Sequence, residues 1–326
     1  MAVTREVLGR ALARVRAAAT DPNGGIHGPG SISWKVNREA VLFLGGGRAA
    51  LLQLAHPFVA HAVDEHSETR SDVQGRFQRT FTNVYAMAFG DLSDALHSAR
   101  RVHNIHSRVR GVIAEDAGAF PRGTRYDAND EQALLWVHAT LVDTAVLVYE
   151  LTVRELTDDE KQRYLDESRP FASLFGIPDE LLWKTWKDFQ SYFREMVESD
   201  VLTVTAPARE MARFLMRPPT PALRPLTQWY VTVTGALLPE RLRRDFAIPH
   251  GRVDSLVFEG SMQVLRRAYP ALPRRLRYVP AYVEAVRRVR GRPGPDRFGR
   301  MIERLALRTL GGSFGAPDES RCPVPH

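Results

Sequence analysis

Apolar positions recur at helical spacing in almost every segment of this 326-residue chain. Residues 39–62 and 130–154 are apolar nearly all round, which predicts two buried helices, the first kinked or ended at Pro57. Residues 72–89 and 91–114 predict two further helices between them. We find neither the strict alternation of a strand nor an internal repeat, so the pattern predicts an all-α protein.

Local start signals mark further helices. Thr157 and Glu160 have the spacing of a capping box, and Pro178 and Pro207 suit the first turn of a helix. The proline-rich residues 217–221 break the chain and form the best internal boundary. Shorter helices are expected beyond this boundary at 223–236, 253–268, 280–289 and 296–310.

Composition sets limits on the class of protein. The chain is 44% hydrophobic and 25% charged, which is typical of a folded globular protein. Its one cysteine, Cys322, excludes a disulfide framework and a thiolate metal cluster. We divide the chain into an N-terminal amphipathic helix and linker (1–30), a large helical core (31–216), basic helices packed on that core (222–310) and an irregular tail (311–326).

The N-terminal residues favour an amphipathic helix over a signal peptide. Arg10, Arg14 and Arg16 interrupt the apolar run that a signal peptide requires. No segment approaches the ~18 consecutive apolar residues that span a bilayer. We therefore predict a cytoplasmic protein whose N-terminal helix is a candidate for peripheral contact with a membrane.

Positive charge is concentrated in the C-terminal part of the chain. The net charge is +7, and residues 251–308 hold fourteen Arg against five acidic residues. A basic region of this kind binds nucleic acid or anionic lipid in some proteins. Because no nucleic-acid motif accompanies it, we expect no nucleic-acid partner and interpret the region as a solvated helical surface.

Two histidines at helical spacing are the first candidates for chemistry. His103 and His106 lie three residues apart, on one face of a predicted helix, and imidazole is a ligand of transition metals and haem iron. Arg76, Arg79 and Thr80 share one face of the preceding helix, and an Arg pair beside apolar surface can hold carboxylates such as haem propionates. Together they indicate a redox site in a helical protein.

Polar residues inside apolar helices form a second group of candidates. His138 and Asp143 lie in the most apolar helix, where buried polar groups need partners. Three roles stay open for His138: a ligand, a support for another ligand, or a hydrogen-bonded core residue. The glycines at 45–47 lack the strand and Lys-Ser/Thr of a phosphate loop, so they indicate close approach of another helix or of a flat ligand.

A non-haem iron site is the alternative arrangement. His56, His61 and His66 are five residues apart, which does not place them on one helical face, and the paired Glu-x-x-His motif of di-iron bundles is absent. Ligands for such a site would come from two groups, namely His56, His61, Asp64 or His66 with His103, His106 or His138. No serine nucleophile elbow, zinc-protease helix or dinucleotide fingerprint supports a hydrolase or a Rossmann enzyme.

Several blocks in order along the chain resemble one oxygenase family. They read GGGRAALLQLAHP, GRFQRTFTNVYAMAFGD, VHNIHSRVRG and YDANDEQALLWVHATLVDT. Between Trp34 and Met216, the chain resembles the family that includes the catalytic domain of latex clearing protein (rubber oxygenase) and the fungal mycophenolate-pathway oxygenase. The resemblance implies a globin-like helical core that holds haem b.

The resemblance also implies roles for individual residues. His106 matches the family's iron ligand, and the Arg-x-x-Lys-Thr signature falls on Arg76, Arg79 and Thr80. Glu65 is the nearest match to the family's candidate base, although its spacing does not align cleanly. The signature lysine is Arg79 here, and a guanidinium has no lone pair to offer iron, so the distal face is expected to be open or held by water or another side chain.

These observations predict a haem b-dependent oxygenase that activates dioxygen at histidine-ligated iron and acts on a hydrophobic small molecule. Its cofactor-binding residues would be His106, His103, His138 and Arg76, and its catalytic residues Arg76, Arg79, Thr80 and Glu65. Two alternatives stay open: a non-haem iron oxidoreductase, and a non-catalytic protein that binds haem or lipid.

Overall fold

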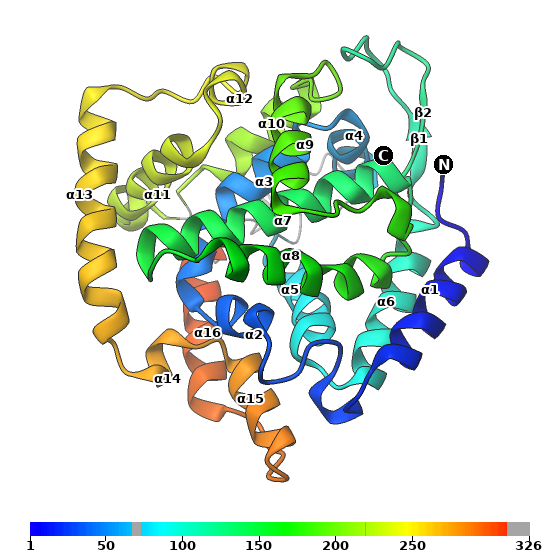
Figure 1. Ribbon diagram of the computed structural model, residues 1–326. Coiled ribbons are helices and arrows are strands. Elements are labelled where there is room, and N and C mark those ends of the chain that lie inside the picture. Colours follow the sequence, from blue (N-terminus) through cyan, green and yellow to red (C-terminus); the bar gives the residue numbers. More distant parts are fainter. Residues whose placement is uncertain (67–72, 219, 312–326) are drawn as a thin grey trace, which may run out of the picture.

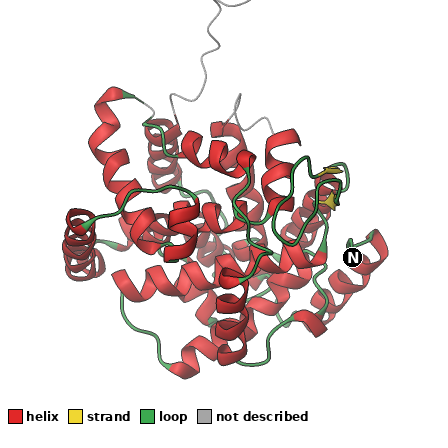
Figure 2. Ribbon diagram, turned by 90° about the horizontal axis from the view of Figure 1, so that it is seen from above, coloured by secondary structure: helices red, strands yellow, loops and turns green. Residues whose placement is uncertain are grey.

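The computed structural model describes residues 1–66, 73–218 and 220–311 (Figures 1 and 2), without the side chains of residues 73–79, 81 and 306–311. Helices make up nearly all of this described part, and the predicted all-α class is confirmed. Of the predicted irregular tail at 311–326, residues 312–326 lie outside the described residues, and Gly311 is the last residue of a helix.

The first half of the chain holds α1 (Arg5–Ala18), α2 (Ile32–Asn37), α3 (Gly46–Leu54), α4 (Pro57–His66), α5 (Val73–Phe89), α6 (Leu92–His106), β1 (Arg110–Val112), β2 (Arg125–Asp127) and α7 (Glu131–Thr152). The second half holds α8 (Asp158–Leu174), α9 (Trp186–Glu198), α10 (Ala206–Leu215), α11 (Arg224–Leu237), α12 (Glu240–Asp245), α13 (Arg252–Ala268), α14 (Arg274–Arg277), α15 (Pro280–Val289) and α16 (Arg297–Gly311). Short 3₁₀ turns, including η2 (Ala40–Gly45), connect several of them.

The segment at 39–62, predicted as a buried helix kinked or ended at Pro57, is three elements, and the break at Pro57 is confirmed. It is divided into η2, α3 and α4, and Pro57 begins the last of these. The glycines explain the first break, because a Cβ on Gly45 would overlap Thr144 of α7 and a Cβ on Gly47 would overlap Thr234 of α11. Close approach of neighbouring helices, one of the two explanations offered by the sequence, is therefore what these glycines permit.

Two further expectations from the sequence are wrong. The helix predicted for 91–114 ends at His106, and β1 then pairs with β2 in an antiparallel register that sets Gly111 against Tyr126. Strands of three residues are too short to show alternation, which is why the sequence pattern missed them. Pro178 is followed only by a 3₁₀ turn, at Asp179–Leu181, instead of a helix.

Helix α7 forms the centre of the core. Figure 1 shows it crossing the middle of the molecule beside α8, and its Trp136 and Ala139 are fully buried in the main apolar cluster. By length and composition α7 would suffice to cross a membrane, so the expectation that no segment reaches that length does not hold. Most of its residues are buried against other helices, as in a central core helix.

A buried arginine joins three of these helices. Arg48 of α3 is 4% exposed, and its guanidinium donates to Asp143 Oδ2 at 2.6 Å and to Thr144 Oγ1 at 2.5 Å, both on α7. Its Nε donates to the carbonyl oxygen of Leu237, the last residue of α11, at 2.8 Å. Burial raises the pKa of the Asp143 carboxyl, and the positive charge of Arg48 opposes that shift. The predicted buried Asp143 is thus satisfied by Arg48.

We expect Arg48→Ala to destabilise the protein by about 3 kcal/mol, because it leaves the Asp143 carboxylate unpaired next to the core. Urea denaturation followed by circular dichroism measures the change in the free energy of unfolding. The control is Arg14→Ala, which removes an exposed ion pair with Asp179 at 3.7 Å and should change stability by less than about 0.5 kcal/mol. Equal effects of the two substitutions would contradict a structural role for the buried pair.

The capping box at the start of α8 predicts a dependence of stability on pH. Glu160 accepts two hydrogen bonds from Arg154 and one from Lys35, which lower the pKa of its carboxyl from 4.5 to about 2. A carboxyl whose pKa is lowered by folding stabilises the fold above its unfolded pKa and loses that contribution as the pH falls. Glu160→Gln should therefore remove about 1 kcal/mol at neutral pH and flatten the loss of stability between pH 4.5 and about 2.

Thermal unfolding at a series of pH values tests this expectation. The matched control is Glu155→Gln, since the Glu155 carboxylate is 77% exposed and pairs only with the half-exposed Arg266 in the described structure. The expectation is contradicted if Glu160→Gln loses stability as steeply as the parent protein between pH 4.5 and about 2.

Candidate functional site

The α5–α6 hairpin brings the two predicted groups of site residues to the same end of the molecule. The helices are joined by a tight turn at Gly90, and Ser98 Oγ donates to Asn83 Oδ1 at 3.2 Å between them. The two helices are antiparallel and rise by the same distance per residue. Counting seven residues back from Asn83 and seven forward from Ser98 therefore places Arg76 level with Ile105, and counting three places Thr80 level with Arg101. The signature positions on α5 therefore lie beside the histidine end of α6.

Of the signature side chains, only that of Thr80 is described, and it is exposed. The side chains of Arg76 and Arg79 lie outside the described residues, so only their positions along the backbone of α5 are known. Those positions agree with the helical spacing that the sequence predicted.

His103 connects α6 to the N-terminal segment. The residue is 6% exposed, and its Nε2 lies 2.9 Å from the carbonyl oxygen of Val3. A carbonyl only accepts, so Nε2 carries the proton, and Nδ1 has no hydrogen-bond partner. The His103 carbonyl accepts from Asn129 Nδ2 at 3.3 Å. The Nε2 of this imidazole is therefore already used in the fold.

His106 is the last residue of α6. Its side chain is half-buried, and its carbonyl accepts from the Val109 backbone N–H at 2.9 Å, where the chain turns toward β1. The structure therefore separates the pair, since His103 faces the N-terminal segment while His106 lies where α6 gives way to the β1–β2 hairpin.

A third histidine, His61, which the sequence offered only as a non-haem ligand, has a carboxylate next to one of its ring nitrogens. His61 of α4 is 3% exposed, and its Nδ1 lies 3.4 Å from Glu65 Oε1, one turn further along the helix. A carboxylate at Nδ1 favours the tautomer that leaves a lone pair on Nε2. That Nε2 is buried and has no hydrogen-bond partner among the described residues, so its lone pair can accept a proton or bind a metal.

The β1–β2 hairpin holds Glu65 in place. Tyr126 of β2 donates its hydroxyl to Glu65 Oε2 at 2.7 Å, and His66 Nε2 lies 2.9 Å from the Arg110 carbonyl. A Cβ on Gly111 would come within 2.7 Å of Glu65 Oε2 and 2.5 Å of the Tyr126 hydroxyl. Sequence reasoning missed Tyr126 and Gly111, although a glycine in a strand often marks such a close approach.

Burial and the hydrogen bond to Glu65 raise the pKa of the Tyr126 phenol, so its hydroxyl stays protonated and donating near neutral pH. The carboxylate of Glu65 then accepts from Tyr126 on one oxygen and faces His61 Nδ1 with the other. The order Tyr126, Glu65, His61 Nε2 runs from the hairpin toward the interior of the protein.

His138 lies in a different surrounding. Its ring is stacked on Trp183 and Phe171, and its Nε2 lies 3.3 Å from Ser168 Oγ of α8. Burial lowers the pKa of this imidazole to about 4, so it is neutral. Of the three roles that the sequence left open, these contacts fit a hydrogen-bonded core residue best.

The non-haem iron alternative gains no support from the described side chains. His56 is 2% exposed, its Nδ1 accepts from the Phe58 backbone N–H at 3.2 Å, and burial lowers the pKa of its imidazole to about 4. Across the described part of the chain, no three His, Cys, Asp or Glu residues converge closely enough to hold a metal ion.

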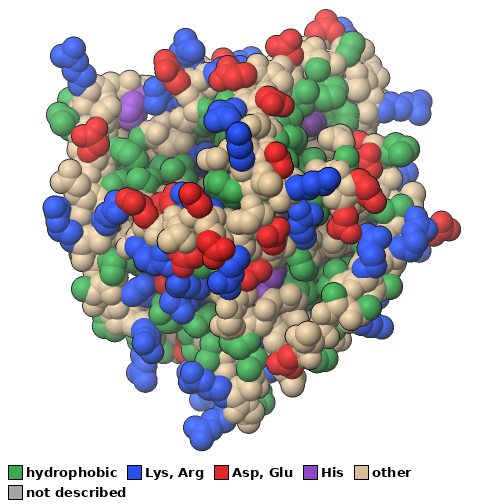
Figure 3. Space-filling view, viewed as in Figure 1, with side chains coloured by type: hydrophobic (Ala, Val, Ile, Leu, Met, Phe, Trp, Pro, Cys, Tyr) green, Lys and Arg blue, Asp and Glu red, His purple; other side chains and the backbone are tan. Residues whose placement is uncertain are grey.

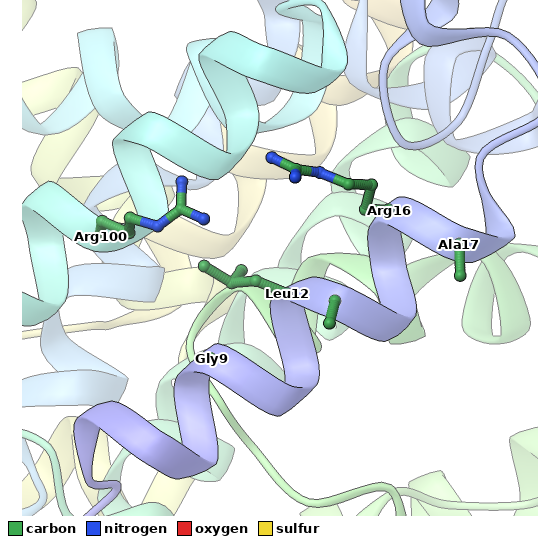
Figure 4. Close-up of a pocket in the computed structure, with 6 residues that line it drawn as sticks. Gly9, Leu12, Arg16, Ala17 and Arg100 are labelled. Atoms are coloured by element: carbon green, nitrogen blue, oxygen red, sulfur yellow. The ribbon is translucent and has the colours of Figure 1, made fainter.

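Two surface depressions lie away from these histidines. One of about 280 Å³ lies between α1 and α6, where Arg16 and Arg100 point toward one another across Leu12 (Figure 4). The other, of about 480 Å³, lies along α10 and is lined by Arg209, Arg213 and Phe214. Neither has a histidine among its described lining residues.

Residues 34–267 match the model of a family described as "ER-bound oxygenase mpaB/B'/Rubber oxygenase, catalytic domain". The match extends from α2 to the end of α13 and so includes every candidate site residue named above. No curated protein and no solved structure matches the chain.

Proposed function

Because the chain belongs to the family of mpaB and rubber oxygenase catalytic domains, we propose that it is a haem b-dependent oxygenase that acts on a hydrophobic small molecule. The observation that carries the proposal is the buried His61–Glu65 pair of α4, which Tyr126 of the β1–β2 hairpin holds in place. The same hairpin follows directly on the end of α6 at His106. Both dioxygen and an apolar substrate would bind at this end of the molecule.

The residues present fit haem. His106 is the half-buried imidazole that the resemblance assigns to the iron. The buried Nε2 of His61 adds a nitrogen that has no hydrogen-bond partner among the described residues. Haem, when bound, supplies the redox chemistry that activates dioxygen, while the protein supplies orientation and a dry surrounding.

The signature residues on α5 would bind the propionate groups of the haem. Guanidinium groups at Arg76 and Arg79 are suited to bidentate hydrogen bonds with the propionate carboxylates. A guanidinium has no lone pair at accessible pH, so Arg79 does not ligate iron. The exposed Thr80 hydroxyl is a hydrogen-bond donor and acceptor for a bound ligand.

His61 Nε2 is the atom that would take a proton in the reaction. Glu65 faces Nδ1 and thereby orients the ring, and Tyr126 fixes the Glu65 carboxylate. Glu65, which the sequence suggested as the base, then acts through His61 as a positioning residue, by the same logic as the acid that orients a catalytic histidine.

We expect His106→Ala, supplied with haem, to lose the Soret absorbance band, because the substitution removes the imidazole that would hold the iron. His103→Ala is the matched control three residues away, and it should keep the band while losing stability through its bond to Val3. Absorbance spectra of the purified variants and a pyridine haemochrome assay measure bound haem. Stoichiometric iron without porphyrin, or a band lost only in His103→Ala, would overturn the assignment.

We expect His61→Gln to keep the Soret band but to slow cyanide binding to the ferric protein by about a hundredfold. Hydrogen cyanide binds iron as the anion, so a nearby base that takes its proton speeds the step. Stopped-flow absorbance measures this rate without knowledge of the substrate. His66→Gln is the control, since that ring faces the Arg110 carbonyl, and it should bind cyanide at the parent rate.

Glu65→Gln should fall between His61→Gln and the parent protein in cyanide binding, because it removes the group that orients the ring but leaves the imidazole. A cyanide rate that is unchanged in both variants would exclude a proton-accepting role for His61.

A further inference from the structure

Helix α13 is apolar on two faces, and only one of them is covered by other described residues. Its inner face packs through Met262, with Phe258 and Leu265, against α11 and α7, and Trp229 Nε1 donates to Ser261 Oγ at 2.9 Å. Its outer face carries four large aliphatic side chains that remain in solvent. The exposed fractions are 73% for Val253, 69% for Leu256, 42% for Val257 and 64% for Val264.

The four exposed side chains form one stripe. Their spacing of three, four and eleven residues places them on the same side of the helix, along about 16 Å of its axis. Single exposed aliphatic residues are ordinary, whereas a contiguous stripe marks an interaction surface. In Figure 1, α13 runs along the left edge of the molecule beside α11.

Basic residues accompany the stripe. Arg252 precedes it, Arg267 continues it, and Arg274 and Arg275 follow on α14 between the exposed Leu272 and Leu276. Figure 3 shows apolar and basic side chains next to each other along the same edge. The nearby carboxylate of Asp254 is turned to the fold, where it accepts from the Gly251 N–H and from Thr232.

We infer that this α13–α14 surface (residues 252–276) binds the surface of an anionic phospholipid bilayer. Exposed aliphatic side chains would enter the headgroup boundary, and the arginines would contact lipid phosphates and carboxylates. The sequence alone suggested the N-terminal helix for membrane contact and a solvated surface here. The inference does not depend on haem or on oxygenase activity.

Charge favours a bilayer over a second copy of the chain as the occupant. An antiparallel pairing of two α13 helices centred between Glu259 and Gly260 would set Arg252 of one copy against Arg267 of the other, at both ends of the contact. Like charges that face each other across an interface oppose association, whereas anionic lipid neutralises both arginines.

Vesicle flotation tests the inference with the full-length protein. We expect binding to vesicles of phosphatidylcholine mixed with phosphatidylserine and much weaker binding to phosphatidylcholine alone. Val253→Asp combined with Leu256→Asp should reduce binding to the mixed vesicles by at least about tenfold, since charge replaces the inserted side chains. Arg274→Gln combined with Arg275→Gln should reduce the preference for phosphatidylserine.

The matched control is Val112→Asp, which alters a 48% exposed valine on the β1–β2 hairpin and should leave binding unchanged. The outer face of α13 is exposed to solvent, so circular dichroism and the midpoint of thermal unfolding should be the same in the aspartate variant and the parent. Undiminished binding of the Val253 and Leu256 variant would overturn the inference. So would a dimer in light scattering that this variant disperses, since the surface would then bind a second copy.

Discussion

A single buried guanidinium sets the positions of the helices that the rest of the protein builds on. Arg48 reaches from α3 to Asp143 and Thr144 of α7 and to the end of α11 at Leu237. A charge this deep in the core is tolerated only with a full set of hydrogen-bond partners, which fixes the three helices relative to one another. The glycines just before Arg48 allow that approach, because a Cβ on either Gly45 or Gly47 would overlap a neighbouring helix.

The candidate site inherits its geometry from this arrangement. Helix α4 follows α3 after a break at Ala55–His56, so the place of α3 determines where His61 and Glu65 lie. The β1–β2 hairpin then closes over Glu65 through Tyr126, with Gly111 leaving room for both groups. Core packing thus determines the position of the site. The hairpin of two short strands determines how the Glu65 carboxylate is oriented, through Tyr126.

Helices with strong local signals could be predicted from the sequence, because those signals act within one turn. The capping box of Thr157 and Glu160 is observed at the start of α8. The break at Pro57 was predicted from the sequence, because proline acts locally. The break between η2 and α3 was missed, and the contacts of Gly45 and Gly47 there are with Thr144 and Thr234, far along the chain. The same limit applied to the site: the spacing of His61 and Glu65 was visible, but Tyr126, 61 residues from Glu65, was not.

The contact between His103 and Val3 has a practical consequence for handling the protein. Val3 accepts from the imidazole through its backbone carbonyl and donates its own N–H to the Asn129 carbonyl, while the Met1 amino group pairs with Glu131 at 3.1 Å. The first residues therefore fasten α6 to the start of α7. An affinity tag or a trimmed start at this terminus would act directly on the end of α6, so fusions intended to leave that region undisturbed belong at the other end of the chain.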